Sequence, residues 1–317
     1  MQTRILLSAA LAAQAALAGV LLIANGAADQ APAMAALLRF PSAQVSKVVI
    51  SDGASSTTLE KSEDRWQLPA LADLPANATR LTTLLQTLEG LQTRWPVVSS
   101  ASGRERFEVS DEKFQRRLEL FEGEELRGTY FFGTSPGFKQ THARRADEDE
   151  VYALSFNNVD LPADSNDWLD KGLLKVAEPT SIEGSDFSLV KSADVWSLAA
   201  TDPSATGELD NAKVVSLVSA LQNLQVLRLS EGAAPAGETR TLIVSDGSTR
   251  WTYEFTQASG QQYVRRSDRP QVFTVSSLDY DRTAGIVLAD LLAQPSESSA
   301  ADEAAVPSQN ASPAPAE

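Results

Sequence analysis

The sequence predicts an α+β protein, with two tandem copies of a mainly antiparallel sheet and one amphipathic helix each, after an N-terminal transmembrane helix. Three observations lead to this prediction. A long apolar run occupies the N-terminus, sequence patterns return after shifts of 121 to 133 residues, and each copy reads as strands, one helix and further strands. This order is typical of antiparallel sheets with segregated helices rather than of alternating βαβ units.

The N-terminal segment is the first predicted element. Residues 5–24 carry no charged side chain, and twenty helical residues at about 1.5 Å each cross the roughly 30 Å core of a bilayer. Arg4 precedes this run and Asp29 follows it, which favours a cytoplasmic N-terminus and an exported body. We therefore expect residues 1–28 to form a membrane anchor. A cleaved signal peptide is the alternative, because small residues surround Ala24.

The body is expected to contain a first repeat over residues 41–176 and a second over residues 177–293. The segment LEKSEDRWQL, which contains Trp66, returns as LVKSADVWSL, which contains Trp196. Six of the ten positions are identical. Both segments favour a strand hairpin that ends near the tryptophan.

An amphipathic helix is expected after each hairpin. Apolar residues recur there at the three- and four-residue spacing of one helix face, at a uniform shift of 133 between the copies. Asn77 and Asp210 precede the two patterns, and a side-chain oxygen at this position accepts an otherwise unpaired backbone N–H. The apolar positions are Leu81, Leu84, Leu85, Leu88 and Leu91 in the first copy and Val214, Leu217, Val218, Leu221 and Leu224 in the second.

Alternating strands complete each copy. The segment ARRADEDEVYAL returns as VRRSDRPQVFTV at a shift of 121, so the second copy is 12 residues shorter between the helix and these strands. The shortening removes a segment like SGRERFEVSDEKF of the first copy. Residues 294–317 lack large apolar side chains and are expected to form a disordered acidic tail.

Composition excludes several classes of function. The formal charge of -15 repels phosphate backbones, so we expect no nucleic-acid partner. The absence of cysteine excludes disulfides and thiolate chemistry, and a single histidine excludes a multi-histidine metal site. The acidic run at residues 147–150 lacks the spaced ligands of a calcium loop and is expected to be a solvated turn. We expect neither a metal nor a cofactor.

One motif resembles a catalytic site. GTSPGFKQTH contains a G-x-S-x-G pattern around Ser135, followed by His142, the only histidine. A nucleophile elbow joins a strand to a helix and uses the N–H of the residue after the serine, but Pro136 has no N–H and the motif lies between two strand patterns. At the shift of 121, Ser135 aligns with Thr256 and His142 with Tyr263, so the second copy lacks the pattern. We expect a hairpin loop and no catalytic residues.

Each of the two copies in this acidic protein carries one arginine pair at the same position. Arg144 and Arg145 return as Arg265 and Arg266. On a strand, the two members of each pair face opposite sides of the sheet. They suit a charge-guarded edge strand or cross-strand ion pairs. The functional alternative is a docking or anion-binding patch, which makes these four residues the candidate interaction surface.

Together these features resemble the bacterial domain-of-unknown-function 4340 family. The resemblance covers most of residues 1–293 and rests on the W-x-L hairpin end, the leucine-rich helix, the (H/Y)-x-R-R strand followed by V-(Y/F), the segment DWLDKGLL and the apolar N-terminus. It implies a single-pass protein of the bacterial inner membrane with its body in the periplasm and no assigned activity. Family members are often encoded beside gliding-motility-type ABC transporter components, which implies these membrane components as partners.

The expected function is that of a non-enzymatic, membrane-anchored accessory or interaction module of an ABC-transporter-type envelope complex. The alternative from another class is a periplasmic binding module for envelope glycan or a small ligand. A hydrolase that uses Ser135 and His142 is the third alternative.

Overall fold

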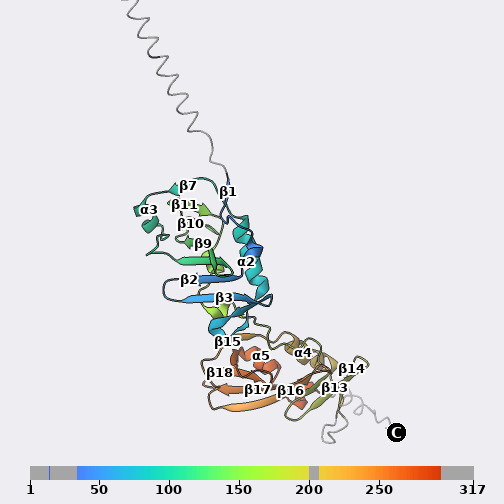
Figure 1. Ribbon diagram of the computed structural model, residues 1–317. Coiled ribbons are helices and arrows are strands. Elements are labelled where there is room, and N and C mark those ends of the chain that lie inside the picture. Colours follow the sequence, from blue (N-terminus) through green and yellow to red (C-terminus); the bar gives the residue numbers. More distant parts are fainter. Residues whose placement is uncertain (1–13, 15–33, 200–206, 294–317) are drawn as a thin grey trace, which may run out of the picture. The chain divides into compact units, whose positions relative to one another are not determined.

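The computed structural model describes Gln14 and residues 34–199 and 207–293, which form two compact units (Figure 1). The first unit ends at Asp170 and the second begins at Lys171. Both consist mainly of antiparallel strands with few helices, which confirms the predicted α+β class with antiparallel sheets.

The predicted membrane anchor lies outside the described residues, except for Gln14. The predicted tail, residues 294–317, lies outside them as well. Among the residues that are described, no helix is long and apolar enough to cross a membrane.

The first unit is built on one large antiparallel sheet. The strands of this unit are β1 (Ala35–Ala36), β2 (Lys47–Ser51), β3 (Ser56–Ser62), β4 (Arg65–Leu68), β5 (Leu74–Pro75), β6 (Gln92–Thr93), β7 (Pro96–Val98), β8 (Arg116–Glu122), β9 (Glu125–Phe132), β10 (Thr141–Arg145) and β11 (Val151–Leu154). The order in the nine-stranded sheet is β5-β4-β3-β2-β8-β9-β10-β11-β7, and β1 pairs separately with β6. The long helix α2 (Ala78–Gly90) runs along this unit, and the short helix α3 (Ala101–Arg106) lies near β7 and β11 (Figure 1).

The second unit repeats this architecture. Its strands are β12 (Ser181–Glu183), β13 (Ser188–Ser192), β14 (Val195–Leu198), β15 (Val226–Leu229), β16 (Glu238–Ser245), β17 (Arg250–Ala258), β18 (Gln261–Arg266) and β19 (Val272–Val275). Its helices are α4 (Asn211–Gln222), α5 (Ser277–Arg282) and α6 (Leu288–Leu291). The strand order β14-β13-β12-β16-β17-β18-β19-β15 matches that of the first sheet from β4 to β7. Among the described residues, β5 has no counterpart in the second sheet.

The long helices begin where the sequence predicts. The Asn77 side chain accepts a hydrogen bond from the backbone N–H of Arg80 over 2.9 Å. Asp210 caps α4 in the same way, through the N–H groups of Ala212 and Lys213. Most of the predicted apolar stripe is buried in each helix: Leu81, Leu84, Leu85 and Leu88 in α2, and Val214, Leu217 and Leu221 in α4. Val218 of the predicted stripe is only half-buried.

The second unit begins before the predicted repeat boundary at residues 176/177. The carbonyl oxygen of Lys171 accepts a hydrogen bond from the N–H of Val226 over 2.9 Å. The hydroxyl of Tyr253 donates to the carbonyl oxygen of Leu174 over 2.7 Å. Residues 171–176 therefore pack against the second sheet.

The constant shift of 121 is wrong over β9. The N–H of Gly133 donates to the carbonyl oxygen of His142 over 2.9 Å, whereas Thr256 pairs with Tyr263. Thr256 is therefore the counterpart of Gly133 and not of Ser135. The physical reason is the loop between the strands, which covers residues 133–140 in the first unit but only two residues between β17 and β18.

Candidate interaction surface

The four predicted arginines lie on β10 and β18, which are interior strands. β10 lies between β9 and β11, and β18 lies between β17 and β19, so the edge-strand interpretation is wrong. Arg144, Arg145 and Arg266 are buried. Of the four, Arg265 alone is exposed, with 51% of its side-chain surface accessible. The structure therefore does not gather the four guanidinium groups into one exposed patch.

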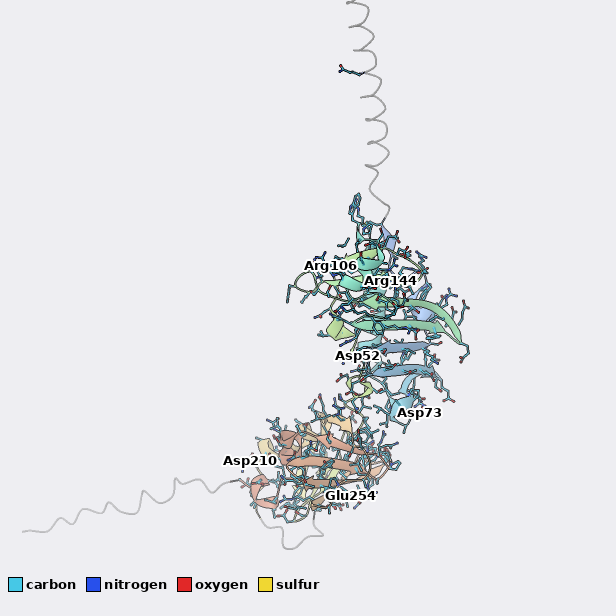
Figure 2. The ribbon with its side chains drawn as sticks, turned by 90° about the vertical axis from the view of Figure 1, so that its left-hand side faces the viewer. Asp52, Asp73, Arg106, Arg144, Asp210 and Glu254 are labelled. Carbon is cyan, nitrogen blue, oxygen red and sulfur yellow. The ribbon has the colours of Figure 1, made fainter. Side chains whose placement is uncertain are left out.

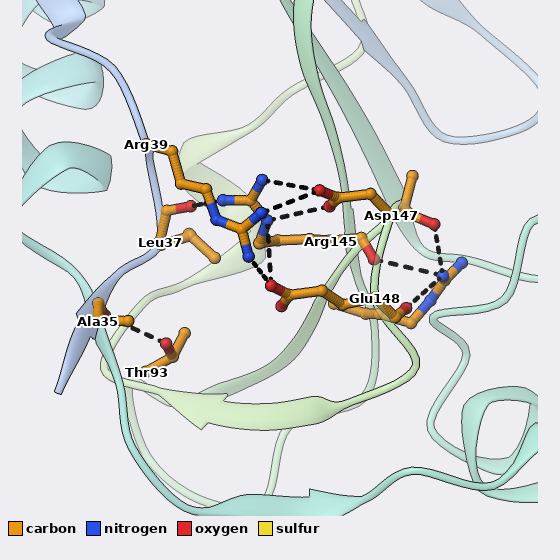
Figure 3. Close-up of polar contacts among 9 residues, drawn as sticks. Ala35, Leu37, Arg39, Thr93, Arg145, Asp147 and Glu148 are labelled. Carbon is orange, nitrogen blue, oxygen red and sulfur yellow. Dashed lines mark hydrogen bonds and ion pairs between the residues drawn. The ribbon is translucent and has the colours of Figure 1, made fainter. Parts of the chain in front are cut away.

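Arg145 fastens the start of the first unit to the sheet (Figure 3). We call residues 34–40 the lead-in of this unit. The Nη1 group of Arg145 donates to the carbonyl oxygen of Leu37 over 2.9 Å. Its Nε and Nη2 groups donate to the two carboxylate oxygens of Asp147 over 3.0 and 3.1 Å. Arg145 is thus held between the lead-in and the turn after β10.

Arg266 makes the corresponding contacts in the second unit, whose lead-in is residues 171–176. Its Nη2 group donates to the carbonyl oxygen of Leu173 over 3.2 Å, and its Nε group donates to Asp268 over 2.6 Å. Hydrogen bonds from Arg266 hold the pKa of Asp268 down, at about 2. Because the same contacts recur in both units, we assign Arg145 and Arg266 a structural role.

The acidic run after β10 is engaged in ion pairs. Arg39 of the lead-in contacts both Asp147 and Glu148, and Arg104 contacts Asp149 (Figure 3 shows the first two pairs). Hydrogen bonding from Arg145 lowers the pKa of Asp147 below its ordinary value. Across the described residues, no group of acidic and histidine side chains is arranged to hold a metal ion.

Arg144 faces the opposite side of the first sheet, where a connecting segment covers it. We call this segment, residues 99–115 between β7 and β8, the insert. The Nε group of Arg144 donates to the carbonyl oxygen of Val109 over 2.7 Å, and its Nη2 group donates to Asp111 over 3.0 Å. Its guanidinium lies 4.8 Å from the ring centre of Phe131. Figure 2 places Arg144 at the same end of the unit as Arg106 of α3.

Apolar packing holds the insert against this face. Val109, Phe131 and Val151 form a buried cluster, against which Val98, Phe107 and Phe114 pack. The backbone also approaches very closely, because a Cβ atom at Gly133 would lie 1.9 Å from the carbonyl oxygen of Phe107. Only glycine fits at such an approach. The insert is therefore an integral cover of the first sheet.

The same face of the second sheet is covered less, with Ala234 packed on it in place of an insert. The connection from β15 to β16 is only residues 230–237, which is shorter than the insert. Arg265, the counterpart of Arg144, pairs across the strands with Glu254, over 2.5 Å from Nη2 and 3.1 Å from Nε. This contact confirms the cross-strand ion pair as one of the predicted roles for these arginines.

A groove of about 580 Å³ lies on this face. Its lining includes Glu254 (labelled in Figure 2), Thr256, Arg265 and Val272. By strand pairing, these four occupy the positions of Phe131, Gly133, Arg144 and Val151 in the first unit. The groove in the second unit is therefore the surface that the insert covers in the first.

The catalytic-looking motif occupies the loop between β9 and β10. The ring of His142 lies 4.0 Å from that of Phe107, and its Nδ1 atom lies 2.8 Å from the carbonyl oxygen of Thr134. Burial lowers the pKa of His142 below its ordinary value. The Ser135 hydroxyl donates to the carbonyl oxygen of Gly137 over 2.6 Å. Both residues belong to the described part, and they form no hydrogen bond with each other.

Sequence reasoning did not identify the groove residues Glu254, Thr256 and Val272. A signal that could have found them is the missing segment of the second copy. Where the connection beside a shared arginine is shorter, the arginine lacks the contacts that the longer connection makes in the other copy.

The chain is thus a duplicated α+β protein, in which the insert covers one sheet face of the first unit and a groove lies on the corresponding face of the second. The sequence profile of a family described as "Domain of unknown function (DUF4340)" matches residues 66–242. This match spans more than half of the chain, and the chain belongs to that family. No curated protein and no solved structure matches the chain.

Proposed function

We propose that the protein is a non-enzymatic, membrane-anchored interaction module of the bacterial envelope, which binds a protein partner through the groove of its second unit. The observation that carries this proposal is the groove around Arg265, at the position where the first unit binds its own insert. A sheet face that accepts a polypeptide in one copy is a suitable surface for a polypeptide in the other.

The groove also has the composition of an interface centre. The exposed Ala233 and the half-buried Ala234 provide apolar contact area, and Arg265 and Glu254 provide polar groups. Arginine is enriched among the residues that dominate binding energy at protein interfaces. A stable interface buries about 800 Å² on each partner, so the surrounding strands and loops would supply the rim.

The location and the partner class come from the sequence. The uncharged run at residues 5–24 supports a single-pass anchor in the inner membrane with the body in the periplasm. The family resemblance supports ABC transporter membrane components as partners. In this proposal, the protein is an accessory subunit of such a transporter complex.

Co-purification from detergent-solubilised membranes tests the proposal. We expect transporter membrane components to accompany the tagged full-length chain, and to be lost from Arg265→Glu. The matched control is Arg250→Glu, because Arg250 is also an exposed strand arginine paired with a glutamate, Glu183, but lies outside the groove lining. Recovery of the chain alone, as a monomer, would contradict the proposal.

A thermal-unfolding series separates this function from the small-ligand alternative. Ligands that bind the native state raise the melting temperature in proportion to the logarithm of their concentration at saturation. We expect envelope glycan fragments to leave the melting temperature unchanged. A concentration-dependent rise that disappears in Arg265→Ala would favour the glycan-binding alternative.

A further inference from the structure

The insert presents its contacts from a tight turn. The N–H of Val109 donates to the carbonyl oxygen of Arg104 over 2.9 Å, and Val109 forms a bridge with Phe114. Between them, the N–H of Ser110 donates to the carbonyl oxygen of Lys113 over 3.0 Å. The turn directs the Val109 side chain into the sheet, where it is fully buried, while its carbonyl oxygen faces Arg144.

Asp111 supplies the second polar contact of this turn. Its carboxylate accepts from Nη2 of Arg144 while 66% of its side chain remains exposed. The contact set is therefore an apolar side chain, the carbonyl oxygen of the same residue and a carboxylate two residues further on. Charge-assisted bonds of this kind are stronger than neutral ones, and the planar guanidinium fixes their direction.

The second unit has the complementary groups without the turn. Arg265 replaces Arg144, and Val272 stands at the position of Val151. Val272 belongs to a buried apolar cluster with Ala258 and Tyr263, against which Ala234 packs. Glu254 accepts from both Nε and Nη2 of Arg265, the two groups that in Arg144 bind the insert. The arginine donors are thus held by an exposed cross-strand partner, which other acceptors can replace.

We propose, resting on the function above, that the groove binds a turn of the partner protein with the same contact set as the insert. The turn places an apolar side chain in the groove, beside the lining residues Ala234 and Val272. Its main-chain carbonyl oxygen and a carboxylate two residues on accept from Arg265. Glu254 competes for the same donors, so the empty groove keeps its guanidinium paired and partner binding releases that pair.

The probe for this inference is a fluorescent peptide of residues 99–115, the insert itself, titrated with the full-length chain in detergent. We expect saturable binding as the concentration of the chain rises, with a weak Kd of about 0.1–1 mM, since a free peptide must also order its turn. Arg265→Ala should weaken binding about tenfold or more, because two charge-assisted bonds are lost. Arg250→Ala should leave binding unchanged.

Two further changes test the contact set and the competition. Val109→Asp or Asp111→Asn in the peptide should each weaken binding severalfold. Glu254→Gln in the chain should strengthen it about two- to fivefold, the range expected for removing an exposed ion pair. A general loss of folding cannot produce tighter binding, so this variant distinguishes competition from misfolding.

The outcomes separate this inference from the proposed function. If no peptide binds while co-purification still depends on Arg265, the inferred turn-shaped ligand is wrong, but the groove remains the partner-binding surface. If the peptide binds as expected but no transporter component co-purifies, the proposed partner class is wrong, but the inferred contact set of the ligand is supported. Peptide binding unaffected by Arg265→Ala would overturn the inference. Self-association that the peptide reverses would identify a second copy as the occupant and would also overturn it.

Discussion

Arg144 donates its Nε hydrogen to the carbonyl oxygen of Val109 over 2.7 Å, and this bond joins the insert to the first sheet. The counterpart of Arg144 in the second unit is Arg265, which has Glu254 as its partner and a groove beside it. The two copies have thus diverged at one surface. In the first unit this surface holds the insert, and in the second it carries a groove.

The first prediction concerns the buried arginine of the second unit. Arg266→Ala leaves Asp268, Tyr253 and the carbonyl oxygen of Leu173 without their common donor. We expect the free energy of unfolding to fall by about 3 kcal/mol, as for other broken buried pairs. Urea titration measures this, and faster amide exchange at Val176 would report the loosened lead-in. The control Arg265→Ala should change stability by less than about 1 kcal/mol; an equal loss would refute the structural role of Arg266.

The second prediction concerns pH. The pKa of Asp268 is about 2 in the folded chain against an ordinary 3.8, so its ionised form stabilises the fold. This stabilisation is complete above the unfolded value of 3.8 and is lost as pH falls towards 2. Asp268→Asn should cost about 1–2 kcal/mol at neutral pH, a value reduced for partial exposure of the carboxylate. Urea titrations should show this difference shrinking in acid. A difference independent of pH would contradict the ionic origin.

The third prediction concerns the cover of the first sheet. Val109→Ala removes a fully buried side chain from the cluster with Phe131 and Val151, and should lower the free energy of unfolding by about 2 kcal/mol. Val97→Ala is the matched control, because Val97 lies on neighbouring β7 with 48% of its surface exposed. Denaturant titration of both variants is the measurement. Equal effects would mean that the insert is a loose surface loop.

Much of the architecture could be predicted from periodicity and caps. The spacing of Leu81 to Leu88 and the caps Asn77 and Asp210 identify the long helices, because these features depend on local sequence. The strand hairpins and the aligned Trp66 and Trp196 likewise agree with the strand pairing. Helix spacing, caps and hairpins depend on residues close together in the sequence, so they can be predicted without knowing the rest of the fold.

The interaction surface could be predicted only in part. The arginine pairs were visible in the sequence, but burial of Arg144 depends on where the insert folds back, which no local pattern records. Loop length also displaced the alignment, since the longer loop after β9 makes Gly133, and not Ser135, the counterpart of Thr256. The burial of Arg144 and the correct counterpart of Thr256 therefore depend on long-range packing and loop length, which local sequence patterns do not reveal.

The fourth prediction concerns the motif around Ser135. The Ser135 hydroxyl donates to the carbonyl oxygen of Gly137, and Nδ1 of His142 lies against the carbonyl oxygen of Thr134. Because these two described side chains form no hydrogen bond with each other, we expect no ester hydrolysis that depends on this serine. The measurement compares hydrolysis of p-nitrophenyl esters by the purified full-length chain and by Ser135→Ala, which should behave alike. Activity that disappears in the variant would support the hydrolase alternative.

The central claim is that the groove of the second unit contacts a partner protein. The most direct measurement is photo-crosslinking in intact membranes, with p-benzoylphenylalanine placed at Ala233 in the groove lining or at the exposed control position Ala54 of the first unit. We predict a crosslink from position 233 to a transporter membrane component, lost in Arg265→Glu, and none from position 54. Equal crosslinking from both positions, or none from position 233 while the complex still co-purifies, would contradict the account.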